Sequence, residues 1–187
     1  MRKLIVFNNV SLDGYFVDAN ASMYWARPGM DDREFHAFAA ASAASEGVLL
    51  FGRITYELMA GYWPTPAAIQ QDPTVAAGMN RMAKVVFSRT LKRATWNNTR
   101  VLSGDLAEEV RKLKAEPGLG LCILGSGSIV AQLAPAALID EYQIVLNPIA
   151  LGAGRSQFEG IPAPVNFRLS QCRTFQNGKV YLSYTPA

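Results

Sequence analysis

A short apolar run that turns directly into a helical pattern constrains the fold of this chain more than any other feature. Residues 48–51 are Val-Leu-Leu-Phe, Gly52 and Arg53 follow, and a helical pattern opens at Thr55. A short apolar run bounded by glycine is typical of a buried strand that leads into a helix. The start of a helix presents free backbone N–H groups and the positive end of its dipole, which together favour phosphate. Arg53 adds a cation that can bind phosphate oxygens in a forked geometry.

Two further junctions strengthen this interpretation. Another apolar run ends in the turn Gly125-Ser126-Gly127-Ser128, and between the two turns a strand-like segment ends at Ser88 and Arg89. The glycines can approach a ligand closely because they lack a Cβ, and the serines can cap a helix or donate to phosphate. The alternative at each junction is an ordinary turn with capping serines and solvated arginines. Their occurrence together favours a phosphate-bearing ligand.

Strands alternate with helices over the first two thirds of the chain, and strands alone follow. We expect strands at residues 3–7, 48–51, 84–88, 100–102 and 121–124, and helices at residues 31–46, 54–60, 74–82, 106–113 and from residue 129. Residues 61–71, rich in proline and aromatic side chains, are expected to form a surface loop. Residues 142–146, 165–175 and 179–184 are strand-like, and Asn177-Gly178 predicts a type I′ hairpin turn. This order predicts an α/β fold with a mixed sheet, in a single domain over residues 1–187.

Composition excludes several classes of protein. Half of the residues are hydrophobic and 18% are charged, which is ordinary for a globular domain. The formal charge of +3 is small and the basic residues are scattered, so we expect no nucleic-acid partner. No apolar run approaches the roughly 18 residues that cross a bilayer, and the polar start is unlike a signal peptide. Cys122 and Cys172 are interpreted as buried thiols in a reducing compartment, so we expect a cytoplasmic protein without membrane contact.

Metal and hydrolase chemistry lack the residues that they need. The chain has one histidine, His36, which lies next to a core-facing position of an expected helix. No cluster has the spacing of metal ligands, and the serines have no His–Asp companions. We therefore expect neither a metal site nor a catalytic triad.

A series of motifs runs in order through nearly the whole chain. They are Ser11-Leu12-Asp13-Gly14, Gly52-Arg53-Ile54-Thr55-Tyr56-Glu57, Val86-Phe87-Ser88-Arg89-Thr90-Leu91, Gly125-Ser126-Gly127-Ser128, and Asp140-Glu141 with Pro148, Leu151-Gly152, Gly154 and Phe158. With these motifs the chain resembles the dihydrofolate reductase superfamily, and within it the bacterial branch that shares its fold with the reductase domain of riboflavin biosynthesis. The resemblance implies a three-layer α/β/α fold with a mixed, mostly parallel central sheet and an antiparallel C-terminal hairpin.

The resemblance also implies NADPH as the cofactor, lying across the strand ends. It places the pyrophosphate at Gly52, Arg53, Ile54 and Thr55, and the 2′-phosphate that separates NADPH from NADH at Ser88 and Arg89. The nicotinamide side and the phosphates would contact Gly125, Ser126, Gly127 and Ser128. Folate enzymes join paired glycines at this last turn by a cis peptide. A cis bond before a residue other than proline costs roughly 2.5–4 kcal/mol, so we do not assume one before Ser126.

The substrate side departs from the folate pattern. Folate enzymes place one carboxylate at a helix start shortly after a Trp-x-x-Pro sequence. Here Trp25 and Pro28 are followed by Asp31 and Asp32, so the carboxylate arrives at least one residue late. Both carboxylates also suit the start of a helix, and Asp31 with Glu34 resembles a capping box.

Asp13 is a second candidate for catalysis, because the family loop that carries it covers the nicotinamide and the substrate. Asp13-Gly14 is also a common turn pair, which is the alternative interpretation. We predict Asp13 and Asp32 as catalytic residues. The predicted substrate-binding residues are Asn8, Asn9, Trp25 and Asp31.

Together these features predict an NADPH-dependent reductase that acts on a C=N or C=O bond of a small pterin-, deazaflavin- or pyrimidine-like heterocycle. A water molecule or Asp13 would deliver the proton. The alternative is a module of the same fold that binds NADPH without turnover, and a weaker one is a nucleotide-dependent enzyme of another class. The resemblance also implies a homodimer formed through the C-terminal strands.

Overall fold

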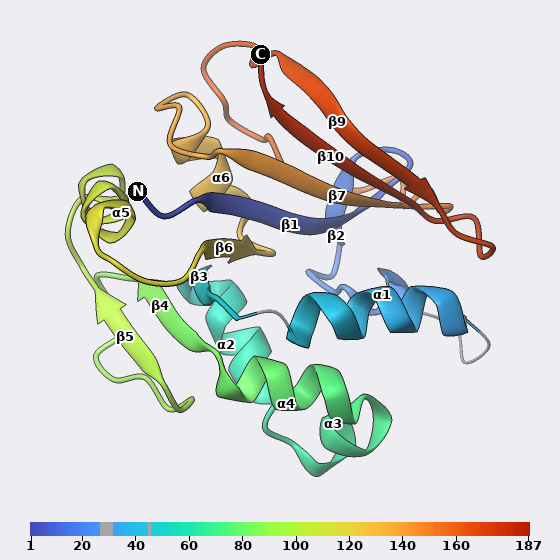
Figure 1. Ribbon diagram of the computed structural model, residues 1–187, viewed down its shortest axis with the longest axis horizontal. Coiled ribbons are helices and arrows are strands. Elements are labelled where there is room, and N and C mark those ends of the chain that lie inside the picture. Colours follow the sequence, from blue (N-terminus) through green and yellow to red (C-terminus); the bar gives the residue numbers. More distant parts are fainter. Residues whose placement is uncertain (27–31, 45) are drawn as a thin grey trace.

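A mixed sheet forms the centre of the molecule (Figure 1). The computed structural model describes residues 1–26, 32–44 and 46–187. The strands of the main sheet are β1 (Leu4–Ser11), β3 (Val48–Gly52), β4 (Ala83–Phe87), β5 (Thr99–Leu102), β6 (Leu121–Leu124), β7 (Glu141–Asn147), β9 (Phe167–Thr174) and β10 (Val180–Pro186). Their spatial order is β5-β4-β3-β6-β1-β7-β10-β9. All neighbours from β5 to β7 are parallel, whereas β10 pairs antiparallel with both β7 and β9.

Helices cover both faces of the sheet, which makes three layers (Figure 1). The helices are α1 (Arg33–Ala44), α2 (Arg53–Tyr62), α3 (Pro66–Gln71), α4 (Pro73–Arg81), α5 (Leu106–Ala115) and α6 (Gly127–Leu133), with a short 3-10 helix η1 (Tyr24–Ala26). On one face, Tyr56 of α2 and Met79 of α4 pack with Phe51, and Phe35 of α1 packs with Val145. On the other face, α5 and α6 pack against β1, β3 and β6. The predicted α/β fold, with its mostly parallel sheet and C-terminal hairpin, is confirmed.

Several local predictions are wrong, and nearby contacts explain why. Residues 66–71 form α3 rather than a loop, because the Thr65 side chain caps the helix and Pro66 suits its first position. β1 continues to Ser11, because it stays paired with β7 up to Asn147. β2 (Tyr15–Asp18) and β8 (Gly154–Ser156), which the sequence does not predict, form a separate two-stranded ribbon.

The C-terminal hairpin also differs in detail from its prediction. The hairpin joins β9 to β10 as expected, but Gly178 has a positive φ (+82°) and Asn177 does not, so the turn is not type I′. The Gly178 N–H donates to the Phe175 oxygen instead, which makes a longer connection. Cys172 lies exposed on the edge strand β9 rather than in the core. Cys122 is partly buried, and desolvation raises the pKa of its thiol to about 12.

Lys84 of β4 is a buried cation at the edge of the core. It is 1% exposed, and its Nζ donates to the carbonyl oxygens of Asn80, Met82 and Asn97 at 3.3, 2.7 and 3.4 Å. The same Nζ lies 4.3 Å from the centre of the Trp96 ring. Burial lowers the pKa of Lys84 from 10.5 to about 8. The ammonium group therefore ties the end of α4 to the loop before β5, at a cost in desolvation.

The lowered pKa makes a prediction for stability against pH. Between the folded and unfolded pKa values the unfolded chain holds the proton and the folded chain does not, so stability rises with pH. We expect the free energy of unfolding of the wild type, relative to Lys84→Met, to rise by about 2 kcal/mol from about pH 7.5 to about pH 9.5. Urea unfolding of the wild type and of Lys84→Met at both pH values measures this change in the free energy of unfolding. Lys92→Met, at an exposed position, is the control, and equal pH slopes for wild type and Lys84→Met would contradict the assignment.

Candidate functional site

The topology changes direction between β3 and β6, which are neighbours in the sheet. From β3 the chain enters α2 on one face and moves on to β4, whereas from β6 it enters α6 on the other face and moves on to β7. The carboxyl ends of two such strands leave a crevice between the loops, and in open α/β sheets ligands bind there. The Gly52 and Gly125 turns lie at the two sides of this crevice.

A cleft of about 1420 Å³ opens at this edge of the sheet and continues beneath α1. Asn9 lines it, and so do all the residues that the sequence predicts to bind a cofactor: Gly52, Arg53, Ile54, Thr55, Ser88, Arg89, Gly125, Ser126, Gly127 and Ser128. The structure therefore brings together residues from separate junctions of the chain. The cleft is also lined by Phe16 and Met23, which no sequence motif distinguishes.

The start of α2 has no side-chain cap. Gly52 occupies the N-cap position with extended backbone (φ −75°, ψ 160°) and has no side chain to offer. In contrast, side chains cap α1, α3 and α5 through Asp32, Thr65 and Asp105. The N–H groups in the first turn of α2 therefore remain available to a ligand in the cleft, and the helix dipole favours an anion there.

Two hydrogen bonds lock the Gly52 and Gly125 turns together. The Gly52 N–H donates to the Ser126 Oγ at 3.0 Å, and the Thr55 hydroxyl donates to the Gly125 oxygen at 2.9 Å. Gly125 has φ +64°, and a Cβ at this position would lie 3.2 Å from Cγ2 of Thr55. Only glycine fits this left-handed, crowded position without strain. The Thr55 hydroxyl and the Gly52 N–H thus hold the two turns together.

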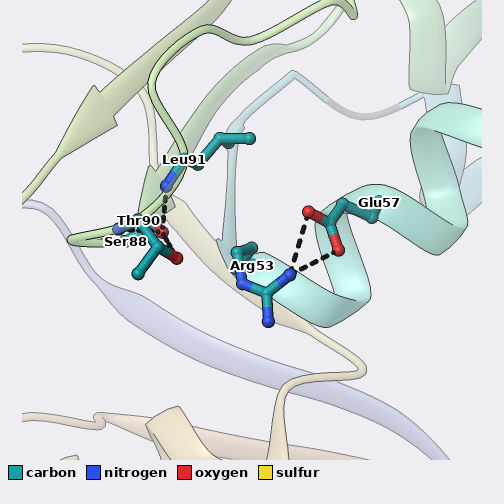
Figure 2. Close-up of polar contacts among 5 residues, drawn as sticks. All are labelled: Arg53, Glu57, Ser88, Thr90 and Leu91. Atoms are coloured by element: carbon teal, nitrogen blue, oxygen red, sulfur yellow. Dashed lines mark hydrogen bonds and ion pairs between the residues drawn. The ribbon is translucent and has the colours of Figure 1, made fainter.

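Arg53 and Ser88 are engaged with near neighbours (Figure 2). The Arg53 guanidinium contacts both carboxylate oxygens of Glu57 at 3.1 and 2.9 Å, in an exposed pair on α2. The Ser88 Oγ accepts from the N–H groups of Thr90 and Leu91 at 3.2 and 2.9 Å, which shapes the turn after β4. Exposed pairs of this kind contribute about 0.3–0.5 kcal/mol, so an anion in the cleft can compete for Arg53.

Arg89 lies at the tip of the turn that Ser88 shapes. Its side chain is exposed and lines the cleft, and it has no acidic partner within the parts of the chain that the structure describes. Ser88 therefore positions the turn, and Arg89 supplies the uncommitted cation.

Gly127 allows a close contact between α6 and the β2 strand. A Cβ on Gly127 would lie 2.6 Å from Cε1 of Phe16, so the aromatic ring packs directly on the helix backbone. All peptide bonds in the described residues are trans, including the bond between Gly125 and Ser126.

Asn8 and Asn9 are neighbours on β1 with different surroundings. Asn8 is buried, does not line the cleft, and accepts from the Gly125 N–H at 2.6 Å. Asn9 lines the cleft, and its Oδ1 accepts from Nδ2 of Asn147 at 3.2 Å. That Nδ2 also donates to the carbonyl oxygens of Val145 and Val10, which can only accept, so the contacting atom of Asn9 is its oxygen. The NH₂ end of Asn9 is therefore left for the cleft.

Asp13 connects two loops. Its carboxylate accepts from the Ser11 hydroxyl at 2.6 Å and from the N–H groups of Gly152 and Leu151 at 2.7 and 3.0 Å. These hydrogen bonds, the one from Ser11 first, lower the pKa of Asp13 to about 2. The group is ionised at neutral pH and holds no proton to deliver, and it does not line the cleft. The geometry therefore favours a structural role over the predicted catalytic one.

The remaining predicted substrate-side residues also have structural contacts. Asp32 caps α1 by accepting from the Phe35 N–H at 3.1 Å, and it accepts from the side chain of Asn177 as well. The Trp25 Nε1 donates to the Ser22 oxygen at 3.1 Å, and Trp25 does not line the cleft. Asp31 lies outside the described residues, so its part in the predicted capping box stays a prediction, and the cap that the structure describes comes from Asp32. In the described part of the chain no His, Cys, Asp and Glu cluster could hold a metal ion, and no helix has the length and apolarity to span a membrane.

Comparison with known proteins agrees with this architecture. The uncharacterized protein YyaP of Bacillus subtilis (strain 168) is 26% identical over 185 residues, which cover 98% of this chain and 94% of YyaP. Among solved structures, a Shewanella sp. PV-4 protein whose name connects it with riboflavin biosynthesis matches with a TM-score of 0.74 and 22% identity, over 100% and 99% of the two chains.

A second solved structure extends the likeness of fold. Dihydrofolate reductase from Enterococcus faecalis, complexed with NADP(H), matches with a TM-score of 0.63 and 17% identity over 98% of this chain and 96% of that chain. The family model of the RibD C-terminal domain matches residues 2–181. The chain therefore belongs to the RibD C-terminal domain family.

Proposed function

We propose that the protein is an NADPH-dependent reductase of a small heterocyclic substrate with a C=N or C=O bond. The observation that carries the proposal is the uncapped start of α2, locked to the Gly125 turn at the crevice between β3 and β6. A dinucleotide has a pyrophosphate that suits the free N–H groups of α2. Arg89 stands at the next strand end, where a 2′-phosphate would find a cation.

The residues present fit NADPH and suggest how the site works. When bound, NADPH supplies a hydride to the substrate. The two locked turns hold their relative position without the ligand, which preorganises donor and acceptor. Apolar walls such as Phe7 and Phe16 limit water in the cleft. Asp13 is ionised, so a water molecule is the better proton source.

Asn9 supports a statement about the substrate. Asn147 donates to the Asn9 oxygen and Asn9 lines the cleft, so the Asn9 NH₂ group is the end that can donate to a substrate. A ring carbonyl oxygen or an unprotonated ring nitrogen would accept from it. Pterin-, deazaflavin- and pyrimidine-like rings all carry such an atom at their edge.

A titration tests the proposed function. Trp63 lines the cleft, so intrinsic tryptophan fluorescence can report binding. We expect NADPH to bind at least about tenfold more tightly than NADH, a difference of about 1.4 kcal/mol. Absent binding, or equal affinity for both, would contradict the proposal.

A second candidate is a module that binds NADPH without turnover. Both predicted catalytic carboxylates, Asp13 and Asp32, are committed to hydrogen bonds within the protein, which favours this alternative. NADPH oxidation across a panel of pterins, flavin precursors and quinoid compounds distinguishes the two. Binding without oxidation of NADPH by any member of the panel would support the module.

Glu57 provides a prediction about affinity. In Glu57→Gln the Arg53 guanidinium loses its ionic partner and a negative charge leaves the start of α2, so we expect NADPH to bind about threefold more tightly. The same fluorescence titration measures it. Glu116→Gln removes an equal charge from a residue that pairs with Arg2 and Arg100 and does not line the cleft, and it is the control. An unchanged or weaker affinity in Glu57→Gln would contradict the availability of Arg53.

We also propose that the chain forms a homodimer through β9. This edge strand leaves one row of backbone groups unpaired, and seven of its eight side chains are exposed, including Leu169 at 52%. Light scattering after size-exclusion chromatography should give twice the mass of one chain. Leu169→Lys should shift the population toward the monomer, and a monomeric wild type would contradict the proposal.

A further inference from the structure

A chain of buried amides outside the cleft lining supports the Gly125 turn. Asn8 and Gln157 are 1% and 2% exposed. The Gly125 N–H donates to Oδ1 of Asn8 at 2.6 Å, and Nδ2 of Asn8 donates to Oε1 of Gln157 at 3.3 Å. Neither Asn8 nor Gln157 lines the cleft, so they can act on a ligand only through the turn.

The orientation of both amides follows from the backbone of Gly125. A backbone N–H can only donate, so the atom of Asn8 that meets it is the oxygen. The other end of Asn8 is then the NH₂ group, and the atom of Gln157 that meets it must be the oxygen. This leaves Nε2 of Gln157 buried without a partner within the described residues. Oε1 of Gln157 therefore accepts a hydrogen bond, whereas Nε2, called the idle end below, makes none among the described residues.

Gln157 is held firmly in place by the segment around it. It follows directly on β8, which pairs with β2, and the next residue, Phe158, packs on the rings of Tyr142 and Phe167 with centroids 6.0 and 5.7 Å apart. This segment keeps the backbone of Gln157 in place, so its Oε1 can accept from Nδ2 of Asn8 and favour that orientation of the Asn8 amide. With Asn8 turned over, its NH₂ group would face the Gly125 N–H, and two donors would meet.

We propose that Gln157 is a positioning residue for the cofactor turn. It fixes the orientation of Asn8, and Asn8 in turn fixes the left-handed Gly125 between Thr55 and Ser126. The inference rests on the proposed function in so far as the ligand of the turn is NADPH. Its structural part, the hold on the Gly125 N–H, stands independently of that ligand.

A matched pair of variants separates this role from a general loss of stability. Gln157→Met removes the acceptor at nearly constant shape, whereas Gln157→Glu keeps an oxygen where Oε1 lies, at the cost of burying a carboxyl group. In Gln157→Met we expect the Kd for NADPH to rise about tenfold, and hydrogen exchange of the Gly125 N–H, measured by NMR, to accelerate about tenfold. In Gln157→Glu both should stay within about threefold of the wild type. Gln70→Met, at an exposed position, is the control.

Thermal melting of every variant accompanies these measurements. A merely structural role predicts that the Kd follows the melting temperature, so that Gln157→Glu is damaged in proportion to its lost stability. That outcome overturns the proposal, and so does an unchanged Gly125 exchange rate in Gln157→Met. A wild type that fails to bind NADPH refutes the proposed function, while the exchange rates still decide whether Gln157 holds the turn.

If Gln157→Met does not fold, Asn8→Asp provides a second test of the hydrogen bond that holds the Gly125 N–H. The carboxylate offers an acceptor to the Gly125 N–H, and Gln157 can turn over to donate its idle Nε2 to the second oxygen. We expect Gly125 exchange within about threefold of the wild type in Asn8→Asp, and a loss of protection of about tenfold or more in Asn8→Leu. Equal exchange in these two variants overturns the proposal.

Discussion

Replacing Arg89 with glutamine is expected to abolish most of the preference for NADPH over NADH. Arg89 is an exposed cation at the β4 end of the cleft with no acidic partner among the described residues, and the 2′-phosphate is the group that distinguishes the two cofactors. Hydrogen bonds to charged groups contribute about 1.5–3 kcal/mol, so we expect the Kd for NADPH to rise about 30-fold. The Kd for NADH should change less than about twofold, because NADH has nothing for Arg89 to bind. Fluorescence titration of both cofactors measures the two constants.

Arg93 provides the control for Arg89. It is exposed in the same loop and does not line the cleft, so Arg93→Gln removes an equal charge without touching the proposed site. If Arg93→Gln weakens NADPH binding as much as Arg89→Gln, the effect is one of net charge. A parallel loss of NADH affinity in Arg89→Gln would place Arg89 at the pyrophosphate instead.

Gly78→Ala is expected to cause a large loss of stability for a change that adds one methyl group. A Cβ on Gly78 of α4 would lie 2.3 Å from the backbone oxygen of Ala43, near the end of α1. A backbone oxygen cannot turn aside as a side chain can, so α1 and α4 must separate. Overpacking of this kind costs about 3 kcal/mol, which corresponds to a fall of about 8 °C in the melting temperature. Because α1 and α4 both line the cleft, its apolar end should widen as well.

Gly61→Ala is the matched control, because Gly61 also lies within a helix. No atom comes within 4 Å of a Cβ at Gly61, so the change meets open space. Alanine is the better helix former, and we expect stability to rise by about 0.5–1 kcal/mol. If urea unfolding gives a lower free energy of unfolding for Gly78→Ala and a higher one for Gly61→Ala than for the wild type, the packing argument is confirmed. A neutral Gly78→Ala would show that α1 moves away from α4 at little cost.

Much of the fold can be predicted from the sequence because its signals are local. The strand that ends at Gly52 and the helix after it follow from apolar runs and turn residues within ten positions. The capped helix at residues 66–71 was open to the same reasoning, since Thr65 and Pro66 are the usual signals of a helix start. The proline-rich composition of residues 61–71 predicts a loop instead, and this prediction is wrong for residues 66–71.

The roles of individual residues in the candidate site depend partly on contacts that local sequence patterns do not report. The sequence predicts which residues lie at the ends of strands, and all the predicted cofactor contacts line one cleft. It predicts Asp13 as catalytic because its loop belongs near the nicotinamide, yet the N–H groups of Leu151 and Gly152 take its carboxylate. Those partners lie 138 and 139 residues away, and no periodicity or turn rule reports them.

The junctions themselves, each with an apolar strand, a glycine and a helix start that favours phosphate, can be predicted from residue types alone. They depend on backbone geometry over a few residues, which residue type controls directly. How the junctions are joined follows from the folded chain. In the folded protein the Thr55 hydroxyl donates to the Gly125 carbonyl oxygen. The Gly125 N–H is held by Asn8, which in turn donates to Gln157, 149 residues away in the sequence. Hydrogen bonds between distant segments depend on how the whole sheet is assembled, and that information is not local.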